Sequence, residues 1–118
     1  MKIFITAIIS SVFFTPAMCQ TKITLKDVSK HTGETVTVCA KVFGIKYLER
    51  SGTTFINVGA AYPASPLTLV IFKKDRNHFT TPPEQLYRNK NICATGTITQ
   101  YKGKSEMIVS KPDAITVQ

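Results

Sequence analysis

The sequence has few of the side chains that most often carry out catalysis. Only two of its 118 residues are histidines, and His31 and His78 lie far apart in the sequence, outside any triad, paired-carboxylate or zinc-ligand pattern. The seven acidic residues are scattered along the chain, and no glycine-rich phosphate loop follows a predicted strand. These absences predict a binding module rather than an enzyme, with no catalytic residue, no metal ligand and no cofactor.

The sequence also lacks a hydrophobic run long enough to cross a membrane. Its apolar stretch near the start, Ile3 to Phe14, is about 12 residues long, whereas a membrane-spanning helix needs about 20. Lys2 precedes this stretch, and the helix-breaking Pro16 and small residues follow it. This order is typical of a secretory signal peptide.

Ala17 and Cys19 are small residues at the two positions that a signal peptidase recognises. We therefore expect a signal peptide over residues 1–19 and a single domain over residues 20–118, periplasmic or secreted, with no integral membrane segment after processing. Lipid attachment through Cys19 is an alternative, although Met18 is bulkier than the residue that normally precedes a lipidated cysteine.

Acidic residues are outnumbered two to one by basic ones. The chain has 15 Lys and Arg against 7 Asp and Glu, and removal of Lys2 with the signal peptide leaves a formal charge of +7. A domain this basic is expected to bind anionic partners such as nucleic acid, acidic polysaccharide or lipid head groups. The alternative is that the charge serves only solubility.

Cysteine is scarce, and two cysteines remain after the predicted cleavage. In VTVCAKV (36–42) and NICATGTI (91–98), apolar residues alternate with positions that include Cys39 and Cys93, so both sulfurs face outward if these segments are strands. An even number of cysteines in an oxidising compartment indicates a disulfide. We expect Cys39 and Cys93 to pair if their strands are neighbours.

The rest of the chain reads as five strands and one short helix. Gly44 is expected to bend the long first strand as a bulge, and Pro82 and Pro83 open the helix, with Thr81 as its cap. The expected elements are a helical turn at 25–30, strands at 35–47, 53–58, 67–72, 91–101 and 105–110, and a helix at 82–88.

Three strands, a short helix and a two-stranded hairpin follow one another in the order of the OB-fold, an all-β, five-stranded Greek-key barrel. The helix lies between strands 3 and 4 in that fold, and strands 1 and 4 are antiparallel neighbours. Their adjacency is the one that a bond between Cys39 and Cys93 requires. The order of elements and the placement of the cysteines therefore predict the same fold independently.

Several segments also carry a family resemblance: GETVTVCAKV, SGTTFINVGAAYP, LTLVIF, NICATGTITQYKGKSEMIV and KPDAI. They resemble the successive blocks of small bacterial OB-fold domains that are regarded as nucleic-acid binding and belong broadly with the anticodon-binding type. Such domains occur alone behind signal peptides or beside secreted nuclease domains. The resemblance covers about residues 25–115 and implies an exported OB-fold that binds nucleic acid. The clustered acids and arginines of a staphylococcal-type nuclease have no counterpart here.

OB-folds usually bind ligands across strands 2 and 3, between the loops that join strands 1 to 2 and 4 to 5. In these regions cations can follow a phosphate backbone while aromatic rings stack on bases, a combination that favours single-stranded DNA or RNA. The candidate residues are Lys46, Tyr47, Arg50, Phe55, Asn57, Tyr62, Lys73, Tyr101, Lys102 and Lys104.

Two questions stay open on the sequence alone. Phe55 and Asn57 face outward if Ile56 and Val58 face the core, and the resemblance then implies base stacking by Phe55. Alternatively, Phe55 fills one end of the barrel, because large aromatic side chains are usually buried. The function has an alternative as well, a structural or adaptor domain that binds protein or acidic glycan.

Overall fold

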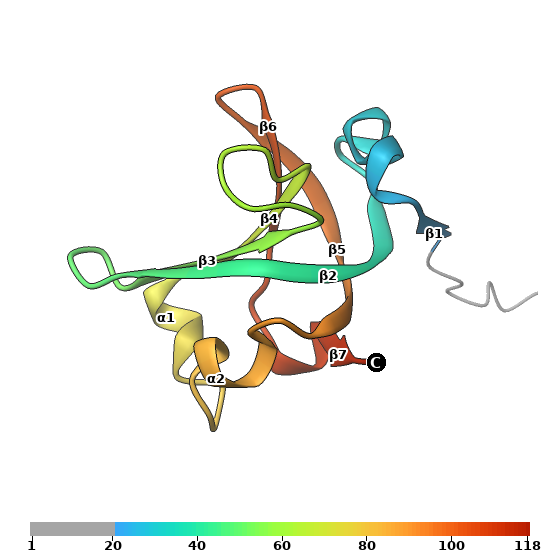
Figure 1. Cartoon of the computed structure of the whole chain (residues 1–118). Coiled ribbons are helices and arrows are strands. Elements are labelled where there is room, and N and C mark those ends of the chain that lie inside the picture. The colour runs from blue at the N-terminus through green and yellow to red at the C-terminus, as the bar shows by residue number, and fades with distance from the viewer. Residues whose placement is uncertain (1–20) are drawn as a thin grey trace, which may run out of the picture.

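The computed structural model describes residues 21–118. The predicted signal peptide, its cleavage site and Cys19 lie outside the described residues. The elements, in chain order, are β1 (Thr21–Ile23), η1 (Leu25–His31), β2 (Thr35–Leu48), β3 (Thr53–Val58), β4 (Leu67–Ile71), α1 (Lys73–Arg76), α2 (Pro83–Tyr87), β5 (Asn91–Tyr101), β6 (Lys104–Ile108), η2 (Pro112–Ala114) and β7 (Ile115–Val117) (Figure 1).

Five of the strands close into a ring. Around it the order is β2, β3, β4, β6 and β5, and β5 pairs again with β2. All of these pairings are antiparallel except β4 with β6, which is parallel. The N-terminal half of β2 pairs with β5 and its C-terminal half with β3, and the register shifts between Val42 and Gly44. The predicted bulge at Gly44 is therefore confirmed. It bends β2 so that this one strand pairs with both β5 and β3.

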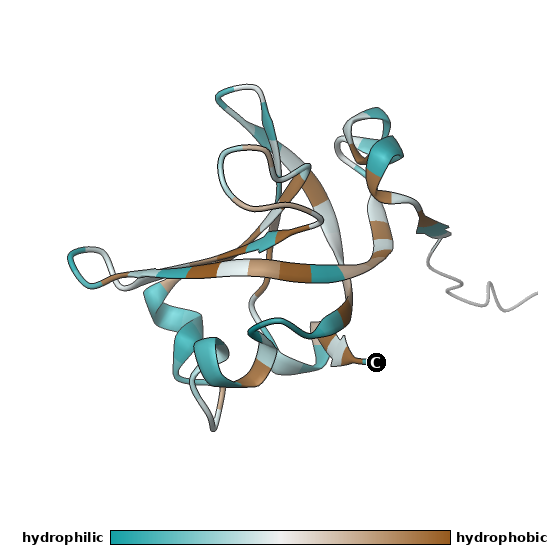
Figure 2. Cartoon of the chain, in the orientation of Figure 1, coloured by the Kyte–Doolittle hydropathy of each residue, from teal (hydrophilic) through white to brown (hydrophobic). Residues whose placement is uncertain are grey.

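The core lies inside the ring because alternate residues of each strand point inward. Ile56 in β3, Leu69 in β4, Ile98 in β5 and Met107 in β6 are all fully buried. Val28 of η1 joins them, and Phe79 meets Tyr87 edge-to-face with their ring centroids 6.3 Å apart. Figure 2 shows the same division, with hydrophobic segments along the strands and mostly hydrophilic residues over α1 and α2.

The disulfide between Cys39 and Cys93 is confirmed. The two residues are register partners on β2 and β5, with their Cα atoms 4.0 Å apart and their sulfur atoms 2.05 Å apart. Hydroxyl pairs continue the same outer row of side chains, because the Oγ1 atoms of Thr37 and Thr95 lie 2.8 Å apart. Period-two alternation on each strand places both sulfurs on the outer face, and the strand order brings them together.

Three features differ from the sequence-based expectation. Two short helices, not one, lie between β4 and β5, because residues 73–76, expected as a polar connection, form α1. Pro82 rather than Thr81 precedes α2, and no side-chain hydrogen bond caps that helix. The short strands β1 and β7 were also not predicted; they add to the outer edges of β2 and β5.

The two ends of the ring carry different connections (Figure 1). The β3–β4 loop and the β5–β6 hairpin extend from one end, while α1 and α2 lie at the other. Across residues 21–118, none of the helices has the length and apolar character needed to traverse a lipid bilayer.

Candidate functional site

A cleft of about 580 Å³ lies on the outer surface of β2, β3 and β4, beside the β5–β6 hairpin, and is called here the first cleft. Its lining includes apolar side chains from β2, a polar pair from β3 and β4, and the Tyr101 ring and two ammonium groups of the hairpin. Seven of the candidate residues line it: Lys46, Phe55, Asn57, Tyr62, Tyr101, Lys102 and Lys104.

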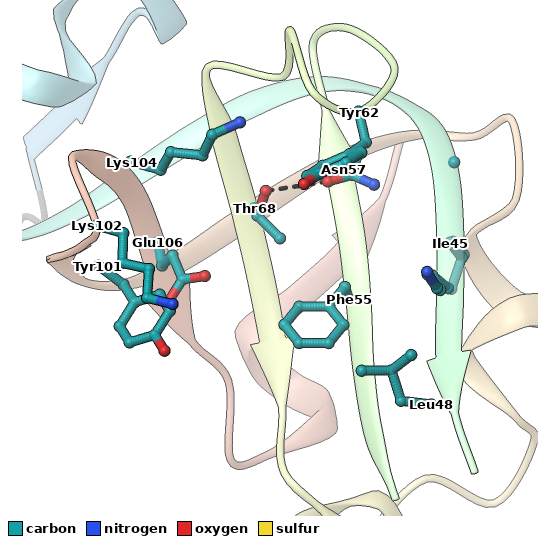
Figure 3. A pocket seen from close by; sticks show the side chains of 12 residues that line it. Ile45, Leu48, Phe55, Asn57, Tyr62, Thr68, Tyr101, Lys102, Lys104 and Glu106 are labelled. Carbon is teal, nitrogen blue, oxygen red and sulfur yellow. Dashed lines mark hydrogen bonds between the residues drawn. The ribbon is translucent and has the colours of Figure 1, made fainter. Parts of the chain in front are cut away.

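Phe55 occupies the middle of the first cleft (Figure 3). Its neighbours in sequence, Thr54 and Ile56, are fully buried in the ring, so alternation turns the Phe55 side chain outward. The ring is half-buried and faces Leu48 on one side and the hairpin on the other. The expectation that Phe55 faces outward is therefore confirmed; it does not fill an end of the core.

Asn57 forms the polar part of the cleft floor. Its Oδ1 atom accepts hydrogen bonds from Ser65 Oγ at 3.2 Å and from Thr68 Oγ1 at 3.0 Å. These bonds fix the orientation of the amide under the β3–β4 loop. Within residues 21–118 no acceptor is bonded to the Asn57 amide nitrogen, so this group can donate to a ligand.

The β5–β6 hairpin supplies one wall of the cleft. Its turn residues, Lys102 and Gly103, have φ angles of 50° and 77°, the left-handed values that a two-residue hairpin turn requires and that glycine adopts without strain. Tyr101 is 59% exposed, and the Lys102 ammonium lies 5.4 Å from the centre of its ring. An exposed ring and a cation therefore stand together at the cleft entrance.

Lys104 joins the hairpin to the β3–β4 loop. Its Nζ donates a hydrogen bond to the carbonyl oxygen of Pro63 at 2.8 Å and lies 4.9 Å from the ring centre of Tyr62. Tyr62 itself is 71% exposed. One ammonium N–H is used in this contact, which leaves two for a ligand.

Glu106 is a lining residue that the sequence analysis missed. Its side chain lies across from Thr68 on β4 and Thr99 on β5, and burial raises the pKa of its carboxyl. Within the described chain it has no ion-pair or side-chain hydrogen-bond partner. The alternation in residues 105–109 could have predicted this position, since Ser105, Met107 and Val109 are buried and Glu106 faces out.

The cleft is basic at its rim, where Lys46, Lys102 and Lys104 lie, and Glu106 adds the one acidic side chain of its described lining.

Three candidate residues lie outside the first cleft: Tyr47, Arg50 and Lys73. Tyr47 pairs with Thr54, one position out of phase with Lys46 and Phe55, so it points to the other side of β2. There its ring stacks against Arg76, whose Cζ lies 4.1 Å from the ring centre. Arg50 is in the exposed β2–β3 turn, and the Lys73 side chain covers Gly52 in that turn.

Arg76 holds α1 and α2 against the ring. One of its terminal nitrogens donates to Thr54 Oγ1 and to Glu84 Oε1, each at 2.6 Å, and the other donates to Glu84 Oε2 at 2.9 Å. The Arg76 and Glu84 side chains are 21% and 24% exposed. The bidentate pairing with Glu84 fixes the Arg76 guanidinium over the Tyr47 ring. This contact is therefore part of the fold rather than part of a ligand site.

We expect Arg76→Ala to lower the free energy of unfolding by about 2 kcal/mol, because it removes charged hydrogen bonds in a partly buried position. Lys74→Ala, an exposed substitution in the same helix, should change it by less than about 0.5 kcal/mol. Urea unfolding at neutral pH measures both. Equal stability of the two variants would show that the Arg76 contacts do not stabilise the fold.

The pH dependence gives a second measurement of this pair. Hydrogen bonds from Arg76 lower the pKa of Glu84 below its ordinary value of 4.5, so the pair's stabilisation is complete above that value and is lost as pH falls through the lowered pKa. Below about pH 4.5 the parent should therefore lose stability more steeply than Arg76→Ala. Parallel pH profiles would contradict this.

Comparison with solved structures gives matches at low identity. A protein assigned as an aspartyl-tRNA synthetase from Leishmania major Friedlin matches with a TM-score of 0.53 and 13% identity, over 90% of this chain and only 22% of that one. An OBody bound to hen egg-white lysozyme gives 0.57 and 15%, over 92% and 98% of the two chains. The structure of yeast Stn1 and Ten1 gives 0.58 and 13%, over 86% and 64%.

A scan against protein-family models and a search of curated proteins both find no match. The structural likeness, the ring of five strands and their order agree with one another. The described chain is an OB-fold domain.

Proposed function

We propose that this protein is a non-catalytic, exported OB-fold module that binds single-stranded nucleic acid in the first cleft. The observation that carries the proposal is the outward, half-buried ring of Phe55 at the centre of a cleft whose rim holds cations and further rings. The finer family resemblance, to small exported bacterial domains of the anticodon-binding type, belongs to the same proposal.

A single strand suits this cleft better than a duplex because its bases can leave the stack and meet an aromatic ring. Stacking of one base on one ring contributes about 1–3 kcal/mol and tolerates any sequence. Lys46, Lys102 and Lys104 lie around the cleft at positions where they can follow the phosphates. The Asn57 amide and the Glu106 carboxylate offer a donor and an acceptor to base edges.

Two further observations support parts of the proposal. One structural neighbour is assigned as a tRNA synthetase, an enzyme that acts on RNA. The Cys39–Cys93 disulfide fits an oxidising compartment, where such bonds persist. Catalysis has no role in the proposal, and the purified protein should not cleave DNA or RNA when divalent metal ions are added.

A protein or acidic glycan partner is the second candidate. Another structural neighbour, the OBody, is bound to a protein, hen egg-white lysozyme. Exposed lysines also occur away from the cleft, for example Lys41, Lys90 and Lys111. A partner of this kind would use charge spread over the surface and would not depend on Phe55.

The experiment that tests the proposal is the binding of labelled single-stranded oligonucleotide across a salt series. For Lys102→Ala we expect weaker binding to every sequence and a salt slope smaller by about 0.7, because one phosphate contact is lost. Lys111→Ala removes the same charge from an exposed residue that does not line the cleft, and it should leave the slope unchanged. Fluorescence anisotropy measures both variants.

Equal effects of Lys102→Ala and Lys111→Ala would mean that binding follows net charge rather than the first cleft. Absence of oligonucleotide binding by the parent at low salt would remove the proposal and favour the protein or glycan partner.

A further inference from the structure

A second cleft, of about 300 Å³, lies between η1, the β3–β4 loop and the β5–β6 hairpin. Figure 1 shows these three segments at the same end of the ring. Its polar lining comes from Lys26 and Ser29 of η1, Ser65 of the loop, and Lys104 and Ser105 of β6. This surface includes η1, which lies outside the five-stranded ring.

The η1 segment is held firmly at this place. Val28 is 1% exposed in the core, and Leu25 packs so closely over Gly59 that a Cβ there would lie 2.5 Å from Leu25 Cδ1. Gln100 Nε2 also donates to Thr32 Oγ1 at 3.3 Å, which joins the segment after η1 to β5. The packing of η1 against the ring therefore fixes the backbone positions of Lys26 and Ser29.

The second cleft offers ammonium and hydroxyl groups, and its described lining contains no acidic residue. Lys26 makes no ion pair within residues 21–118. The nearby Asp27 accepts from Thr24 Oγ1 at 3.0 Å and lies 3.5 Å from the Lys30 ammonium. Lysine and serine side chains in this combination can donate to several oxygens of one phosphate group.

The two clefts are adjacent because Lys104 lines both of them. Its ammonium sits over Tyr62 and donates to the Pro63 carbonyl, at the boundary between the clefts. A strand that places a base on Phe55 and continues past Tyr62 therefore reaches Lys26 and Ser29 next.

We propose that the second cleft binds a backbone phosphate of the same strand whose base occupies the first cleft, so that the nucleic-acid path continues onto η1. This inference rests on the proposed function and extends it. The recognised group is a phosphate ester, held by the ammonium groups of Lys26 and Lys104 and by the hydroxyls of Ser29 and Ser105; the Ser65 hydroxyl already donates to Asn57.

Lys26→Ala and Lys30→Ala form a matched pair for the test, since both remove one positive charge from η1 and only Lys26 lines the cleft. With labelled oligodeoxythymidylate at low salt, Lys26→Ala should weaken binding about two- to fivefold and reduce the salt slope by about 0.7. Lys30→Ala should bind as the parent does. Inorganic phosphate should shift the amide resonances of Ser29 and Ser105 in the parent and much less in Lys26→Ala.

Equal oligonucleotide affinity of Lys26→Ala and Lys30→Ala would overturn the inference while leaving the first cleft as the binding site. Phosphate-induced shifts without a Lys26 effect on oligonucleotide binding would also overturn it, because the cleft would then take free phosphate only. A parent that binds no oligonucleotide would instead show that the proposed function itself has failed.

Discussion

Replacement of Phe55 by leucine should weaken oligonucleotide binding about 5- to 150-fold, because it removes a stacking contribution of about 1–3 kcal/mol. Leucine keeps much of the apolar volume of this half-buried position, so the fold should persist. The salt slope should stay nearly unchanged because no charge is lost. Fluorescence anisotropy across a salt series, with urea unfolding of the same preparation, measures these quantities.

Phe43 provides the control for this substitution. It is 46% exposed on β2, lies outside the first cleft, and has the Lys41 ammonium 5.4 Å from its ring centre. Phe43→Leu should leave oligonucleotide affinity within about twofold of the parent. If Phe55→Leu folds and binds as the parent does, the ring is not a stacking platform. The protein or glycan partner then becomes the better candidate.

Removal of the disulfide should have the largest effect on stability. The bond joins residues 54 positions apart, and for a loop of this length the chain-entropy model gives a stabilisation of about 4 kcal/mol. The double substitution Cys39→Ala and Cys93→Ala should therefore lower the free energy of unfolding by about that amount. Urea unfolding of the variant and of the oxidised parent measures the difference.

Thr35 and Thr97 allow a matched control on the same two strands, since their Oγ1 atoms lie 2.9 Å apart at an exposed register pair. Replacing both with alanine should cost less than about 1 kcal/mol. The disulfide lies on the half of β2 that pairs with β5, away from the half that lines the first cleft. The folded fraction of the cysteine variant should thus bind oligonucleotide with unchanged affinity. A stability loss no larger than that of the threonine control would contradict the prediction.

Local patterns were enough to predict which side of β3, of β5 and of the N-terminal half of β2 faces the core. In β3 the alternation of Thr54, Phe55 and Ile56 is visible in the sequence, and the side chains follow it. The same alternation on β2 and β5 placed both cysteines outward, and their match in parity indicated the pairing. A period of two is a property of the extended backbone itself, so it needs no knowledge of the neighbouring strands.

The register between strands could not be predicted from local patterns. It decided which candidate residues line the same cleft. Tyr47 and Lys46 are adjacent in a basic and aromatic segment, yet only Lys46 pairs with Phe55 and lines the first cleft. The shift between Val42 and Gly44 and the β3 pairing set this phase. A one-residue change in register moves every side chain of a strand to the opposite face.

By itself, the sequence determined the order of the five ring strands, the inward and outward sides of β3 and β5, and the outward position of both cysteines. Only the tertiary structure decided that Glu106 and Thr68 share the first cleft with Phe55, that Arg76 binds Glu84, and that η1 borders a second cleft. The first group follows from backbone geometry and short-range alternation. The second depends on contacts between distant segments, whose positions are fixed only when the ring closes and the core packs.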